Sequence, residues 1–293
     1  MSQKKAEAII ALALTLRGTS LLFSKLAMRT VGPYTLCGIR FLISFAVVAL
    51  IFHKHLKGVT KAEIGHSALV GFLSFLCMAF ELNGLKTTPS STTAFLENSS
   101  VMIIPFIAAV VYRRLPKAMD ILSAVIAMAG IGFLTLKGSS FNFTKGELLI
   151  LAGGVSFAFT VVAMDFATKN DDPLRIGIIH MFFIGLFSLI ASFIFEGFKM
   201  PTAPAEWGAI LYLALVCGAI GFTLQPVGQK YTTPERSGLY VACNPLAAAV
   251  MGVIFLGERL TPASLVGGLL VLVSIFLPAA VSNGLFSRGK EKA

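Results

Sequence analysis

Several charged side chains lie inside long apolar stretches of this 293-residue chain, and four of them are the clearest candidates for function. Arg17 is in the middle of the first stretch and Arg40 near the start of the second, while Glu81 is near the end of the third and Glu97 in the first part of the fourth. A charge in hydrocarbon costs at least ~2.5–3.5 kcal/mol, so such residues usually face a polar cavity and have a function. Their chemistry is ion pairing, with each other or with a small polar ligand.

Arg17 is too deep in its stretch to reach water easily, so it needs an anion nearby. The candidates are Glu97, Glu81 or the carboxylate of a bound ligand. A fixed Arg17–Glu97 ion pair that only holds two helices together is the plainer alternative. For Glu81 the plainer alternative is contact with water, or an ion pair with Lys86, near the end of its stretch.

Neutral polar side chains in the same stretches could complete a ligand site. Their amide and hydroxyl groups can hydrogen-bond a polar ligand, or they can bond between helices at ~0.6 kcal/mol each on average. The predicted ligand-binding residues are Arg17, Glu81, Glu97, Asn98, Gln225, Tyr240 and Asn244.

Three residues are candidates for proton transfer or gating. Glu97 is the clearest, as a carboxylate well inside an apolar stretch. His180 is a candidate because imidazole titrates near neutral pH, and Arg40 occupies the matching place 140 residues earlier. The plainer alternatives are helix packing for His180 and anchoring at the membrane interface for Arg40.

The chain carries no pattern for covalent, metal or phosphate chemistry. No glycine-rich phosphate loop precedes a Lys-Ser or Lys-Thr pair, so an ATP signature is missing from the sequence. We therefore expect no enzyme, no metal and no cofactor. The four histidines lack metal-ligand spacing, and the four cysteines lie in apolar runs as small packing residues; they are His53, His55, His66 and His180, and Cys37, Cys77, Cys217 and Cys243.

Ten apolar stretches fill the chain almost end to end and place it in a lipid bilayer. Hydrophobic residues make up 56% of the sequence and charged residues 13%. A helix needs roughly 20 apolar residues to cross the ~30 Å hydrocarbon core, and continuous rather than alternating runs indicate helices. We predict an all-α integral membrane protein with ten transmembrane helices, at 6–27, 33–53, 66–85, 90–112, 118–137, 146–167, 174–195, 207–227, 234–256 and 262–282.

The net charge of +10 comes from basic residues scattered over short loops, which argues against nucleic-acid binding. Lys and Arg gather on the cytoplasmic side of membrane proteins. With the N-terminus inside, 15 basic residues are cytoplasmic, 6 are external and 3 lie within spans, which accounts for all 24. This count predicts a multi-pass protein of the inner or plasma membrane with both termini in the cytoplasm.

An internal repeat relates the two halves of the sequence. Pro33 and Pro173 are 140 residues apart, and Gly84-Leu85-Lys86 and Gly228-Gln229-Lys230 are 144 apart. Such a drifting offset indicates a duplicated unit, which we place at residues 1–140 and 141–293. Each unit holds five spans, and this odd number inverts the second copy in the membrane. Inverted repeats build many secondary transporters, with the substrate site where the halves meet.

Several local patterns resemble those of the drug/metabolite transporter superfamily, in its EamA-like group. They are Arg17-Gly18-Thr19-Ser20 followed by Lys25, Arg40-Phe41-Leu42, Asn244-Pro245-Leu246, and the run from Leu256-Gly257-Glu258-Arg259 through Thr261-Pro262 to Gly267-Gly268. The likeness covers the whole chain. Two departures are Arg17, where the family usually has Trp, and Tyr112-Arg113-Arg114, where Gly-Glu-Arg is usual.

The resemblance implies a ten-helix carrier that moves a small molecule by alternating access. It also implies a cavity lined by spans one, three, four, six, eight and nine, with spans five and ten at the periphery. Because Arg17 and a carboxylate would suit a zwitterion, we expect an amino acid or related metabolite, moved outward, with protons as a candidate coupling ion. The alternative is proton-coupled export of lipophilic cations through Glu97. A non-transporting membrane scaffold is a third hypothesis, which the short loops disfavour.

Overall fold

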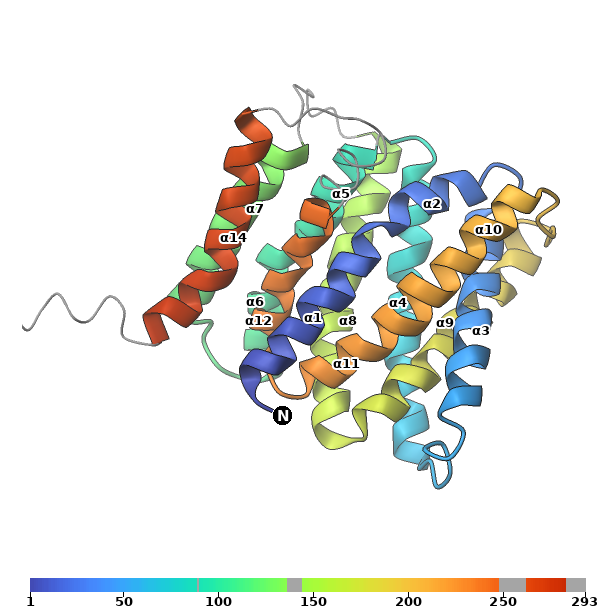
Figure 1. The fold of residues 1–293 in the computed structure, drawn as a ribbon, viewed down its shortest axis with the longest axis horizontal. Coiled ribbons are helices and arrows are strands. Elements are labelled where there is room, and N and C mark those ends of the chain that lie inside the picture. The colour runs from blue at the N-terminus through green and yellow to red at the C-terminus, as the bar shows by residue number, and fades with distance from the viewer. Residues whose placement is uncertain (89, 136–143, 248–261, 283–293) are drawn as a thin grey trace, which may run out of the picture.

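The structure, a computed structural model, describes residues 1–88, 90–135, 144–247 and 262–282. Every regular element in these residues is a helix (Figure 1). In chain order they are α1 (Gln3–Gly18), α2 (Ser20–Ala27), α3 (Pro33–Ile51), α4 (Lys61–Leu85), α5 (Ser90–Asn98), α6 (Ser100–Val111), α7 (Ala118–Thr135), α8 (Lys145–Asn170), α9 (Pro173–Phe195), α10 (Pro204–Tyr212), the π-helix η1 (Leu213–Phe222), α11 (Thr223–Gln229), α12 (Pro234–Leu239), the 3₁₀-helix η2 (Tyr240–Ala242) and α14 (Pro262–Ser282).

These helices form ten consecutive segments, which confirms the predicted all-helical architecture. Six segments are long and apolar enough to cross a bilayer, and three shorter apolar helices, Phe95–Val111, Ala118–Phe133 and Leu265–Leu277, belong to others. The ninth segment begins with α12 and η2; the last part of its predicted range, from residue 248, and the end of the fifth lie outside the described residues. Segments one, four and eight are each built from consecutive helices, α1–α2, α5–α6 and α10–η1–α11.

Local sequence explains where the helices begin. Thr60 accepts a hydrogen bond from the backbone N–H of Glu63, whose carboxylate accepts one from Thr60, and Thr144 and Glu147 do the same at α8. These reciprocal bonds satisfy backbone donors that a helix leaves unpaired at its start. Helices α3, α9 and α10 instead begin at a proline, whose fixed φ and missing N–H suit the first helical position.

The two halves pack as a twofold arrangement requires. Helix α1 packs on α11 and η1, and α4 packs on α8, so segment one meets eight as segment three meets six. Helix α3 packs on α9, α6 on α12, and α7 on α14, so each of these pairs joins equivalent segments of the two halves. Figure 1 shows α7 and α14 together at one edge of the bundle, in agreement with the expected peripheral place of spans five and ten.

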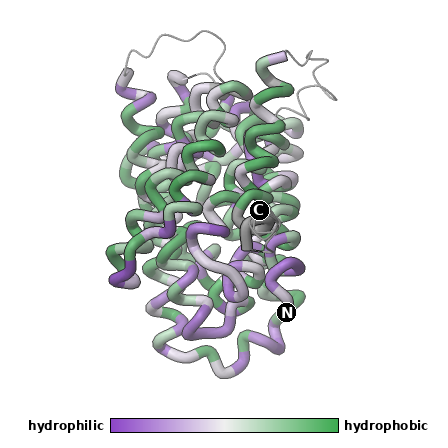
Figure 2. The backbone as a smooth tube through the Cα atoms, turned by 90° about the vertical axis from the view of Figure 1, so that its left-hand side faces the viewer, coloured by the Kyte–Doolittle hydropathy of each residue, from purple (hydrophilic) through white to green (hydrophobic). Residues whose placement is uncertain are grey.

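The apolar outer surface fits a lipid environment. Leu50, Val110 and Phe195 expose 74%, 78% and 73% of their surface, which a bilayer accommodates and water does not. Figure 2 shows hydrophobic segments along most of the bundle and hydrophilic segments gathered at the end that holds the N-terminus. We call this end the N-terminal face.

Charged residues are concentrated on the N-terminal face. Every ion pair found among the described residues lies there, at helix ends or in the adjoining loops. The pairs are Glu7–Arg236, Glu63–Arg175, His66–Asp171, Arg114–Glu235 and Asp165–Lys169. On the opposite face, the part of the chain that the structure describes shows hydrogen bonds but no ion pair within 4.0 Å. For example, the backbone N–H groups of Tyr34 and Thr35 donate to the Glu196 carboxylate.

Candidate substrate site

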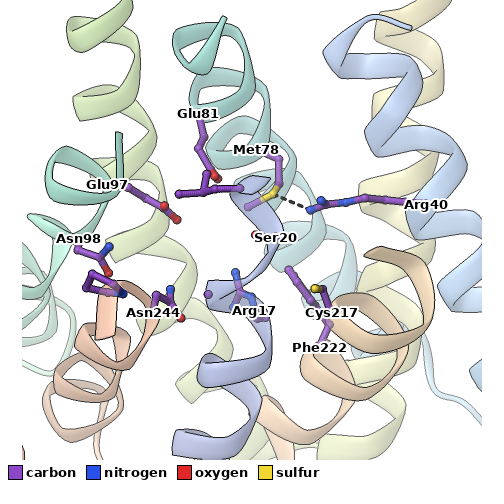
Figure 3. A pocket seen from close by; sticks show the side chains of 13 residues that line it. Arg17, Ser20, Arg40, Met78, Glu81, Glu97, Asn98, Cys217, Phe222 and Asn244 are labelled. Carbon is purple, nitrogen blue, oxygen red and sulfur yellow. Dashed lines mark hydrogen bonds between the residues drawn. The ribbon is translucent and has the colours of Figure 1, made fainter. Parts of the chain in front are cut away.

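A small cavity lies between the two halves of the bundle, with a volume of about 30 Å³. Segments one to four of the first half and segments eight and nine of the second line it. A water molecule needs ~10–15 Å³ of such space, so the cavity has room for one or two waters. Its polar lining residues are Arg17, Ser20, Arg40, Glu81, Glu97, Asn98 and Asn244 (Figure 3).

Two helix interruptions lie at this cavity. Helix α1 gives way to α2 at Thr19, and α5 gives way to α6 at Ser99. The Thr19 hydroxyl donates to the Leu16 carbonyl at 2.8 Å, and the Ser99 hydroxyl donates to the Leu96 carbonyl at 2.6 Å. Hydroxyl groups of this kind compete with the helical ladder for backbone acceptors. Broken helices in carriers occur where the backbone lines a site.

Irregular helix geometry also shapes the second half of the site. Residues Leu213–Phe222 form a π-helix and Tyr240–Ala242 a 3₁₀-helix. Such stretches inside longer helices are frequent at functional sites. The π-helix ends at Phe222, whose ring lies beneath the Arg17 guanidinium at 4.1 Å from Cζ to the ring centroid.

Arg17 is held by neutral groups. Its Nη1 donates a hydrogen bond to Gln225 Oε1 at 2.5 Å, and its guanidinium stacks on Phe222. Among the described residues no carboxylate lies within 4.0 Å of it, so the predicted alternative of a fixed Arg17–Glu97 ion pair is wrong. The glutamine and the aromatic ring satisfy part of the guanidinium. Its charge is balanced at longer range by Glu97 and Glu81, without a direct ion pair to either.

Arg40 also lines the cavity, so the alternative of an interface anchor is wrong. Only 4% of its surface is exposed. Its Nη2 donates to the Met78 sulfur at 3.2 Å, and its guanidinium lies 4.6 Å from the Phe41 ring centroid. A thioether is a weak acceptor, so Arg40, like Arg17, has capacity for a stronger anionic partner.

Glu81 and Glu97 lie on the same side of the cavity. They expose 4% and 8% of their surfaces, and Figure 3 shows the two carboxylates pointing toward one another. Glu81 Oε2 has no hydrogen-bond partner within the described residues. The alternatives of water contact or a pair with Lys86 are wrong for Glu81, because it is buried in the bundle while Lys86 is exposed at the end of α4.

The structure brings together most of the predicted site. Arg17, Glu81, Glu97, Asn98 and Asn244 all line the cavity. Gln225 joins the site through Arg17 and also lines a second cavity of about 20 Å³ on the other side of that arginine.

His180 lines the second cavity rather than the first. Its Nδ1 donates to the Ile176 carbonyl at 2.9 Å, and its ring stacks on Phe222 at a centroid distance of 5.8 Å. Only 1% of its surface is exposed. These contacts are those of a packing residue, and its role in proton transfer stays a prediction.

Tyr240 does not line either cavity. Its hydroxyl donates to Glu7 Oε2 at 2.9 Å, in a cluster at the N-terminal face. The reason is its place in the segment, because α12 begins at Pro234 on that face and six residues of helix rise only about 9 Å. Tyr240 therefore lies outside both cavities, and its role in ligand binding stays a prediction.

The cluster around Glu7 was missed from the sequence. The Glu7 carboxylate accepts hydrogen bonds from Gln3 Nε2 at 2.9 Å, from Arg236 Nε and Nη2 at 2.9 and 2.8 Å, and from Tyr240. It joins the first segment to the ninth across the N-terminal face. Glu7 and Arg236 are 229 positions apart, and the Lys-X-Glu pattern at 5–7 and 145–147 gave only a weak signal for it.

Close helix packing seals both ends of the site. A Cβ atom on Gly228 would lie 2.5 Å from Ile10 Cγ1 and 2.9 Å from the Ala6 carbonyl, at the N-terminal face. A Cβ atom on Gly84 would lie 2.5 Å from Ile150 Cγ1 and 2.6 Å from the Gly146 carbonyl, at the opposite face.

These two contacts are equivalents under the repeat, since the glycines are 144 positions apart and their partners 140 apart. The structure therefore has the same seal on both faces. With the small cavity between these two contacts, the described residues leave no room for a metabolite at the site.

A small cavity with charged lining residues between two inverted helical repeats is the arrangement expected of a membrane carrier. The comparison with known proteins agrees, because the EamA-like transporter family matches residues 4–136 and 144–279. The chain belongs to the EamA-like transporter family, within the drug/metabolite transporter superfamily. It is a membrane transporter and not an enzyme. The division at residue 140 stays a prediction.

Relatives match most of the chain. An "Uncharacterized transporter" of Archaeoglobus fulgidus is 23% identical over 288 residues, covering 94% of this chain and 98% of the relative. The "Uncharacterized inner membrane transporter YedA" of Escherichia coli is 25% identical, covering 83% and 80%. A crystal structure at 18% identity has a TM-score of 0.79 over 95% of this chain and 99% of its own, which shows the same fold.

Proposed function

We propose that this transporter moves a small zwitterionic metabolite, an amino acid or a close relative, out of the cell across the inner membrane. The observation that carries the proposal is the charge set of the cavity, which contains two arginines, Arg17 and Arg40, and two glutamates, Glu81 and Glu97. The groups of each sign have unused capacity, since Arg17 bonds a glutamine and Glu81 Oε2 has no partner among the described residues.

Charge balance favours a zwitterion over a cation. With all four side chains ionised, the cavity has a net charge of zero. Burying an uncompensated charge is expensive in a low-dielectric interior. A zwitterion keeps the total at zero, whereas a lipophilic cation would add one positive charge unless a proton left the site. This difference supports the zwitterion and makes proton-coupled cation export the competing outcome.

Transport requires the closed site to open. A cavity of about 30 Å³ holds no metabolite, because ligand pockets measure roughly 300–1,000 Å³. In inverted-repeat carriers, movement of one repeat against the other opens the central site to each side in turn. The matched seals at Gly228 and Gly84 are suited to open alternately.

The function can be tested with purified protein in liposomes. We expect counterflow of a radiolabelled zwitterion such as 2-aminobutyrate, and none of a lipophilic cation such as tetraphenylphosphonium. Glu97→Gln should lower the zwitterion rate at least about ten-fold, the scale of one lost charge-assisted bond.

Glu147→Gln is the matched control, because Glu147 caps α8 away from the cavity and its loss should leave the rate within about two-fold. Counterflow of the cation instead of the zwitterion, or normal transport by Glu97→Gln, would contradict the proposal.

We also propose that the N-terminal face is cytoplasmic. The basic loops lie on this face, and the positive-inside rule places such loops in the cytoplasm. In a variant without its native cysteines, Thr202→Cys should react with an impermeant thiol reagent added to intact cells, and Lys57→Cys should react only after lysis. The two positions are exposed on opposite faces, so the reverse labelling pattern would show the opposite orientation.

A further inference from the structure

The internal repeat relates two helix contacts of this protein residue by residue. Gly221 of η1 lies against the Ala13 carbonyl of α1, so close that a Cβ atom on this glycine would be 3.4 Å from that oxygen. Gly153 of α8 lies in the same way against the Cys77 carbonyl of α4, where a Cβ atom would be 3.3 Å away. Positions 13 and 153 differ by 140, and positions 77 and 221 differ by 144, which are the spacings of the internal repeat. The contact between segments one and eight is therefore repeated between segments three and six, with equivalent residues facing each other.

One turn further along, the two copies differ in their chemistry. In the first contact Arg17 donates to Gln225. The equivalent positions in the second contact are Phe157 for Arg17, at a spacing of 140, and Glu81 for Gln225, at a spacing of 144. The second copy therefore has a carboxylate in place of the amide and a phenyl ring in place of the guanidinium that would bind it.

This difference gives a physical reason for the unpartnered oxygen of Glu81. Its Oε2 is buried, has no hydrogen-bond partner within the described residues, and belongs to a residue that lines the cavity. Phe157 offers it no donor. An orphaned polar atom costs more when it is charged. Arg40 and Arg17 are the cationic neighbours of Glu81, but neither bonds Oε2, so an ammonium group that reaches this oxygen would supply the missing donor.

Glu97 adds a second carboxylate at the same place. The carboxylates of the two glutamates point toward one another (Figure 3). Two adjacent carboxylates repel, and a cation between them relieves that repulsion. A primary ammonium group suits them because it has three donors and no acceptor.

We infer that Glu81, together with Glu97, forms the ammonium subsite of the cavity, opposite the anion subsite at Arg17, and that Phe157 keeps this subsite open. The inference rests on the proposed transport of a zwitterion and assigns which residues take its amino group. It also makes Phe157 a specificity-determining position, although Phe157 itself lines the second cavity beside Arg17.

Three matched probes separate the subsites. Butylamine has the ammonium group alone, butyrate has the carboxylate alone, and 2-aminobutyrate has both. Binding of each to the purified full-length protein can be measured from the rise in thermal unfolding temperature with ligand concentration. We expect Glu81→Gln to weaken butylamine and 2-aminobutyrate binding at least about ten-fold and to leave butyrate within about two-fold.

Phe157→Arg gives an independent test that leaves Glu81 intact. The new guanidinium should donate hydrogen bonds to the Glu81 carboxylate, as Arg17 donates to Gln225. Amine binding should therefore fall as it does in Glu81→Gln. Phe157→Leu is the control and should keep amine binding, because it adds no donor.

The subsite is rejected if butylamine and 2-aminobutyrate fail to stabilise the wild-type protein. It is also rejected if amine binding survives Glu81→Gln, or if Phe157→Leu abolishes it as fully as Phe157→Arg does. Failure of the proposed function looks different, since liposomes would then show no zwitterion counterflow while butylamine binding still depended on Glu81.

Discussion

Replacement of Arg17 by leucine is expected to weaken binding of 2-aminobutyrate and butyrate by about 10²- to 4 × 10³-fold. Removing one partner of a desolvated charge pair costs ~3–5 kcal/mol, because the other charge is left buried and unpaired, and each 1.4 kcal/mol is about ten-fold in affinity. Butylamine has no carboxylate, so its binding does not depend on Arg17 as an anion-binding partner. Its binding should stay the same or improve, since a repelling positive charge is removed.

Arg17→Lys is the matched variant for this experiment. Lysine keeps the charge but not the planar fork that lets arginine bind a carboxylate with two parallel hydrogen bonds. We expect it to recover part of the carboxylate binding while losing the contact with Gln225. Unchanged binding of 2-aminobutyrate in Arg17→Leu would reject the anion subsite and leave Arg17 as a residue that only joins α1 to α11.

Gly228→Leu is expected to stop zwitterion counterflow while the protein still folds. A Cβ atom at residue 228 would meet Ile10 Cγ1 and the Ala6 carbonyl, and a backbone oxygen cannot rotate away. Helices α1 and α11 then cannot close, so the site stays open to the N-terminal face. Gly84→Leu should have the mirror effect on α4 and α8 and hold the opposite face open.

Cys217 reports which face is open, because it lines the cavity and is a free thiol. In protein that keeps only this cysteine, an impermeant reagent should label Gly228→Leu from the N-terminal side and Gly84→Leu from the other side. Gly208→Leu is the control, since no atom lies within 4 Å of a Cβ placed there. Labelling of both glycine variants from the same side would rule out alternating seals.

Much of the architecture was readable from the sequence because membrane helices follow from long apolar runs. Proline at 33 and 173 marked equivalent helix starts, as the structure shows. The breaks at Thr19 and Ser99 were not predicted, because one hydroxyl residue that bonds backwards leaves the apolar run intact. Only the packing of neighbouring helices reveals that each break lies at the cavity.

The sequence also indicated which charged residues line the cavity, but not their partners. The cost of a charge in lipid was enough to predict Arg17, Glu81 and Glu97 as residues of a cavity. The bond from Arg17 to Gln225 spans 208 positions, and its formation depends on the register of α1 against α11. The place of Tyr240 at the N-terminal face was not readable for a similar reason, since its depth depends on where α12 begins.

Within the residues that the structure describes, the two faces of the transporter are not held by the same contacts. At the N-terminal face Glu7 binds Arg236 with two hydrogen bonds and accepts two more from Gln3 and Tyr240. Its equivalent in the repeat, Glu147, bonds Thr144 of its own helix start and no arginine in the described part of the chain. The resting protein should therefore spend most of its time with the N-terminal face closed.

Unequal closure gives the carrier different half-saturating concentrations on its two sides. When only a fraction of molecules is open to a compartment, the apparent dissociation constant on that side rises by the inverse of the fraction. In the proposed orientation the apparent dissociation constant is larger on the cytoplasmic side. Export would therefore become fast only when the substrate accumulates in the cell. The substrate gradient, and not this asymmetry, still fixes the direction of net flow, because closure strength alters rates and apparent affinities but adds no free energy.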